Sequence, residues 1–138
     1  MKTEKIKKWL PYIEADFKMA ELGLIDKKAN KWTLLSVIWH CHQVAEKSLK
    51  MYIIASGKEL VPVHDLPRLI KYSGLEMEKE RVEFLYLLNK YYITPRYPDL
   101  PLTKSYTSAS SKLAENYFNQ SKEFFIWIKK IITEEKAS

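Results

Sequence analysis

The sequence predicts an all-α fold, an antiparallel bundle of four long helices plus one short helix. Apolar residues recur every three or four positions over long segments, which is the spacing of one face of a helix. Only three of the 138 residues are glycine, which argues against a sandwich or barrel with many tight turns. The connections between the segments are short, as in antiparallel bundles. We expect residues 1–138 to form a single domain.

The first two helices are expected at about residues 3–24 and 31–56. Pro11 lies inside the first pattern, so it either kinks this helix or marks a start just before it. Gly23 and the polar stretch DKKAN predict the break between the two helices. Gly57 is placed to cap the end of the second helix.

A short helix is predicted at about residues 65–72, with Asp65 as its N-cap and Gly74 at its end. A fourth helix follows at about 78–92. The stretch TPRYPDLP, residues 94–101, then stops it, because proline disfavours helix at the residue before it. The last helix is predicted at about 104–133, with a frayed polar tail.

Composition and charge narrow the classes of function. A net charge of +6 permits contact with a nucleotide or nucleic acid, and a scattered, solvated lysine surface explains it equally well. The lone Cys41 can form no disulfide within the chain, the N-terminus lacks the apolar core of a signal peptide, and no apolar run approaches the ~18 residues of a membrane span. These features predict a cytoplasmic protein with no membrane segment.

The stretch WHCHQ first suggests a metal site, but the spacing argues against it. His40 and His42 are two residues apart, so on a helix they point about 200° apart and cannot hold one ion. No metal and no cofactor are predicted. In the following turns Glu46 lies four residues before Lys50, the spacing of a stabilising pair, and Lys47 lies on the face next to it.

Two short polar stretches carry the candidate binding residues. In HDL, His64 and Asp65 either cap a helix or offer a polar pair at a helix start, where phosphate is favoured. In RYPD, the fork of donors of Arg96 could hold a carboxylate such as that of Glu46, or a phosphate. Tyr97 beside it offers a surface for stacking.

Three of these pieces together resemble a known family. The order HCHQVAEKSLKMYI, then HDL, then YYITPRYPD resembles the HEPN domain (higher eukaryotes and prokaryotes nucleotide-binding), over about residues 9–132. The resemblance implies a bundle of four long helices plus a short one and a homodimer. It also implies a minimal nucleotidyltransferase as partner, in toxin–antitoxin pairs where the HEPN member is an RNase. That activity uses an Arg and a His separated by four to six residues and brought together across the dimer.

This sequence departs from the RNase pattern. None of Arg68, Arg81 and Arg96 is followed by His at that spacing, and the residue that precedes His64 at a similar spacing is Lys58, not Arg. The leading hypothesis is therefore a HEPN-like domain without the usual RNase motif.

Such a domain would bind a nucleotide such as ATP or GTP, a minimal nucleotidyltransferase, or both. The residues predicted to bind the ligand are Lys47, His64, Asp65, Arg96 and Tyr97. An enzyme is the less favoured alternative, a metal-independent toxin-type RNase that cleaves RNA with His64 as general base and Arg96 on the phosphate. A third hypothesis is a purely structural helical module in which HDL and RYPD pin helix ends.

Overall fold

The predicted fold class is confirmed by the structure, a computed structural model that describes residues 3–93 and 109–137. All regular elements of these residues are helices, four of them long and one short. After a 3-10 turn at Thr3–Lys5 they are α1 (Ile6–Ile25), α2 (Lys31–Ala55), α3 (Leu66–Ser73), α4 (Lys79–Ile93) and α5 (Ser111–Ala137).

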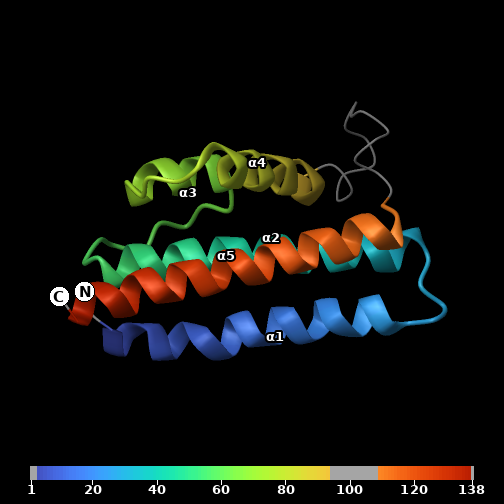
Figure 1. The fold of residues 1–138 in the computed structure, drawn as a ribbon, viewed down its shortest axis with the longest axis horizontal. Coiled ribbons are helices and arrows are strands. Elements are labelled where there is room, and N and C mark those ends of the chain that lie inside the picture. Colours follow the sequence, from blue (N-terminus) through green and yellow to red (C-terminus); the bar gives the residue numbers. More distant parts are fainter. Residues whose placement is uncertain (1–2, 94–108, 138) are drawn as a thin grey trace.

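The helices form three layers (Figure 1). α2 and α5 pack together in the middle layer, α1 covers one side of them, and α3 and α4 lie on the other side. α1 and α4 run opposite to α2 and α5, as the bundle prediction requires, and α1 begins at the end of the bundle where α5 ends (Figure 1). α2 therefore has neighbours on both sides, which explains why most of its residues are buried.

The core lies along the seams of α2. Fully buried apolar side chains come from every α-helix and include Ile13, Ile38, Leu49, Leu69, Leu85, Leu88, Phe124 and Ile128. Asn30 starts α2 with a capping box, in which its side chain accepts from the Thr33 backbone N–H and its own N–H donates to the Thr33 hydroxyl. The capping box therefore fixes the residue at which α2 begins.

The predicted caps of the short helix are confirmed. The Asp65 carboxylate accepts from the backbone N–H of Arg68 at 3.1 Å, and Gly74 ends α3 with a left-handed φ of 68°. Gly57, just after α2, has a φ of 92°, as expected of a glycine that closes a helix.

Three details correct or refine the predictions. The predicted break between the first two helices is present at residues 26–30, but α1 runs through Gly23 and ends at Ile25. A Cβ at Gly23 would lie 2.5 Å from Val37 Cγ2, so α1 approaches α2 closely at this glycine. α1 also begins five residues before Pro11, which lies inside it. The last helix was predicted to begin too early, since Ala109 and Ser110 precede α5, and it runs on to Ala137 where fraying was expected.

Candidate functional site

The predicted ligand-binding residues fall into separate parts of the structure. Arg96 and Tyr97 lie outside the described residues. Lys47 pairs with Asp16 of α1, Nζ to Oδ2 2.6 Å. His64, in the connection before α3, instead contacts Glu46 of α2, Nδ1 to Oε2 3.0 Å. Lys47 and His64 thus belong to two different polar clusters, and whether they bind a ligand stays a prediction.

Glu46 is the centre of the first cluster. Its side chain is only 5% exposed, and its Oε2 accepts from both Lys50 Nζ and His64 Nδ1, each at 3.0 Å. The predicted pair of Glu46 and Lys50 is confirmed. His64 itself is 60% exposed, so a buried carboxylate holds an imidazole at the surface. Because an ionised carboxylate can only accept, His64 Nδ1 carries a proton, and when the ring is neutral its Nε2 is left with a lone pair.

Asn89 of α4 ties this cluster to the start of α3. Its side-chain oxygen accepts from the backbone N–H of Leu66 at 3.0 Å, and its Nδ2 donates to Asp65 Oδ1 at 2.9 Å. His42 Nε2 lies 3.1 Å from the same Asn89 oxygen. Since that oxygen is an acceptor, His42 Nε2 must be the donor, which fixes the tautomer of a neutral His42 with a bare Nδ1.

Burial keeps His42 neutral. The ring is inaccessible and stacks on Tyr92 with ring centroids 4.1 Å apart. Desolvation lowers the pKa of His42 to about 4, against the opposing effects of the hydrogen bond to Asn89 and the charge of Glu46. His42 Nδ1 lies 3.8 Å from Glu46 Oε1, and neither atom has a hydrogen-bond partner among the described residues.

The second cluster lies on the other side of α2, at the seam with α1. Buried Asp16 accepts from Lys47 Nζ, and its other oxygen lies 2.9 Å from His40 Nδ1. Lys47 Nζ also lies 5.9 Å from the ring centroid of exposed Tyr12. The divergence of His40 and His42 predicted from their spacing is confirmed, since one faces α1 and the other faces α4.

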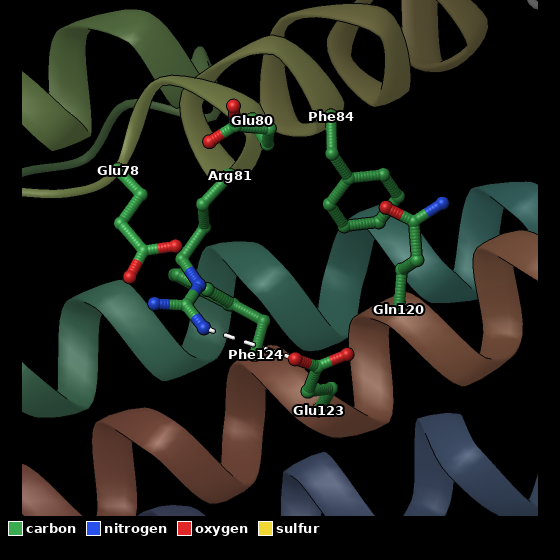
Figure 2. Close-up of a pocket in the computed structure, with 7 residues that line it drawn as sticks. All are labelled: Glu78, Glu80, Arg81, Phe84, Gln120, Glu123 and Phe124. Carbon is green, nitrogen blue, oxygen red and sulfur yellow. Dashed lines mark ion pairs between the residues drawn. The ribbon is translucent and has the colours of Figure 1, made fainter.

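A pocket of ≈ 210 Å³ lies apart from both clusters, between the start of α4 and the middle of α5 (Figure 2). Arg81 reaches into it, 3.9 Å from Glu123 and with its guanidinium 4.0 Å from the ring centroid of Trp127. Glu78 and Glu80 line the same pocket, so its charge does not suit a phosphate. None of the predicted ligand-binding residues among the described ones lines it.

Sequence reasoning missed two members of the Glu46 cluster. Asn89 belongs to no motif of the sequence, and the only chemical role considered for His42 was that of a metal ligand. No group of three or more His, Cys, Asp or Glu side chains in the described ranges could hold a metal ion. Across these same ranges no helix is long and apolar enough to cross a membrane.

The structure is thus a layered bundle of helices with a polar cluster between α2 and the α3–α4 pair. Comparison with protein families then gives its name, because the HEPN domain profile matches residues 6–131, nearly the whole chain. The chain belongs to the HEPN domain family, as the resemblance of its motifs implied. Comparisons with curated proteins and with solved structures gave no match.

Proposed function

We propose that this HEPN domain binds the phosphate group of a nucleotide at the exposed edge of the Glu46 cluster, without the RNase motif of the family. The observation that carries the proposal is the pair of donors on one buried carboxylate. Lys50 and His64 both donate to Glu46 Oε2, so a nearly buried ammonium group and an imidazole at the surface converge on one carboxylate oxygen. Phosphate oxygens accept strongly from such donors.

The distribution of charge favours this location over the pocket beside Arg81. The protein has a net charge of +6, whereas the pocket beside Arg81 is rimmed by glutamates. Lys47, three positions before Lys50, pairs with Asp16 on the side of α2 that faces α1, so it does not add to the charge at this location. Arg96, three positions after the end of α4 in the sequence, is proposed as an additional phosphate ligand on the strength of the sequence alone.

Titration with fluorescently labelled ATP and GTP tests the proposal. We expect saturable binding by the wild type and affinity reduced about tenfold or more in Lys50→Met and His64→Ala, because each loses a charge-assisted hydrogen bond of about 1.5–3 kcal/mol. Lys79→Met is the control. This substitution also removes one positive charge, but from an 83% exposed side chain on α4.

Two results contradict the proposal. One is the absence of binding at millimolar nucleotide for the wild type and for Arg96→Ala alike. The other is equal loss of affinity in Lys50→Met and Lys79→Met, which would show only a dependence on net charge.

A second candidate function is metal-independent RNA cleavage with His64 as general base. Its support is the hydrogen bond from His64 Nδ1 to buried Glu46, which leaves Nε2 of an exposed ring free to take a proton. Incubation of wild type and His64→Ala with tRNA and mRNA decides it. Cleavage by the wild type alone is expected, and equal background cleavage by both proteins eliminates this function.

The proposal extends to partners. The family resemblance implies a homodimer and a minimal nucleotidyltransferase, and the outer face of α4 offers an apolar surface for one of them. Tyr86 and Leu87 are exposed there beside Val82, in a groove flanked by charged residues. Light scattering of the purified chain should give twice the mass of 16.4 kDa, and a monomer at micromolar concentration contradicts the homodimer.

A further inference from the structure

The Glu46 carboxylate has donors on only one of its two oxygens. Oε2 accepts from Lys50 and His64, while Oε1 has no partner among the described residues. The atom that Oε1 faces, His42 Nδ1 at 3.8 Å, is also an acceptor, because the proton of neutral His42 is on Nε2. Two buried lone pairs thus face each other with no proton between them.

The charged and titratable groups around this pair come from three parts of the fold. α2 contributes His42 and Lys50, and the connection before α3 contributes His64 and then Asp65. α4 contributes the phenol of Tyr92, whose ring covers His42, together with the neutral amide of Asn89. Among the described residues, Lys50 and His64 are the two groups that donate to Glu46.

A phosphate ligand would compete for these same donors. If Lys50 Nζ and His64 Nδ1 turn to phosphate oxygens, Glu46 keeps no hydrogen bond in a site where its side chain is 5% exposed. An ionised carboxylate left buried without a donor is strongly disfavoured, and such a group binds a proton instead. Once protonated on Oε1, Glu46 can donate to the bare Nδ1 of His42 after the two atoms approach by about 1 Å.

We propose that nucleotide binding at this site is coupled to the uptake of one proton from solvent by Glu46, which then donates a hydrogen bond to His42 Nδ1. This inference rests on the proposed nucleotide binding. In the free protein Glu46 Oε1 and His42 Nδ1 both lack a donor within the part of the chain that the structure describes, and the added proton would supply the hydrogen bond between them. Because the bound state holds one proton more than the free state, affinity rises as the pH falls, by up to about tenfold per pH unit.

Calorimetric titration with ATP in buffers of different ionisation enthalpy tests the coupling. The slope of the observed enthalpy against the buffer's ionisation enthalpy counts the protons taken up, and we expect about one for the wild type near pH 7.5. Glu46→Gln should bind ATP with an uptake near zero, because the amide of Gln already offers His42 Nδ1 a donor. Glu134→Gln, at an exposed carboxylate of α5, is the control and should match the wild type.

The outcomes separate this inference from the proposed function. Wild-type binding without proton uptake overturns the coupling and leaves nucleotide binding intact. Equal uptake by wild type and Glu46→Gln also overturns it, since the proton would then reside on another group such as His64. Absence of ATP binding by the wild type overturns both proposals.

A second variant tests the coupling even if Glu46→Gln does not fold. His64→Gln keeps a donor for Glu46 and has no imidazole to protonate. We expect its uptake to stay at about one proton, although its affinity is lower. A slope near zero in this variant contradicts the assignment of the proton to Glu46.

Discussion

At the scale of single residues, buried His42 makes the stability of the fold sensitive to acid. Its pKa in the folded state is lowered, mainly by desolvation, to about 4, whereas the unfolded chain has the ordinary value of 6.5. The unfolded state therefore binds the proton first as the pH falls. The stability that depends on a neutral His42 is fully present above about pH 6.5 and is lost as the pH falls towards 4, by about 3 kcal/mol at most.

Urea unfolding between pH 7 and pH 4 measures this loss. The control is His42→Gln, which keeps a donor for Asn89 but cannot be protonated in this range. We expect the free energy of unfolding of the wild type to fall more steeply with decreasing pH than that of the variant. Parallel curves for the two proteins would show that His42 is not the residue responsible.

Residue contacts could be predicted from the sequence only where they are local. The pair of Glu46 and Lys50 and the cap by Asp65 follow from spacings of three or four positions, and both are present. The hydrogen bond from His42 to Asn89 joins residues 47 positions apart, and that from His64 to Glu46 joins residues 18 positions apart. No periodicity of the sequence specifies such contacts, since they depend on how the helices pack.

At the scale of elements, the close approach of α1 and α2 depends on Gly23. A Cβ there would lie 2.5 Å from a methyl group of Val37, which is inaccessible in the core. Gly23→Ala should therefore destabilise the fold by about 1–3 kcal/mol, even though alanine is the better helix former. Exposed Glu21→Ala on the same helix is the control, expected within about 0.5 kcal/mol of wild type.

The urea concentration at the midpoint of unfolding measures this effect, provided that wild type and Gly23→Ala show the same dependence of the free energy of unfolding on urea. A stability equal to or above that of the wild type contradicts the tight seam. The sequence indicated a helix break at this glycine because glycine is typical both of helix ends and of close packing. Only the position of α2 shows that Gly23 serves close packing and not a helix end. The lengths of the helices could therefore be predicted from the sequence, whereas the role of Gly23 could not.

At the scale of the whole molecule, the fold divides the acidic and basic side chains along α2 between two seams. The Asp16, His40 and Lys47 cluster faces α1, and the Glu46, His42 and His64 cluster faces α3 and α4. The order of elements and the family followed from the sequence, because helical periodicity and three motifs span most of the chain. The separation of Lys47 from His64 could not be predicted from the sequence, because it depends on the rotation of α2 within the bundle.

The central claim is that a nucleotide binds at the Glu46 cluster, and the three histidines of the chain allow it to be located. The measurement is a series of NMR spectra of ¹⁵N-histidine-labelled protein during titration with ATP. We predict saturable shifts of the ring nitrogens of His64 and His42, because the first changes its partner and the second gains a donor, while those of His40 stay in place. Shifts of His40 alone, or no shift of any histidine at saturating ATP, would contradict the account.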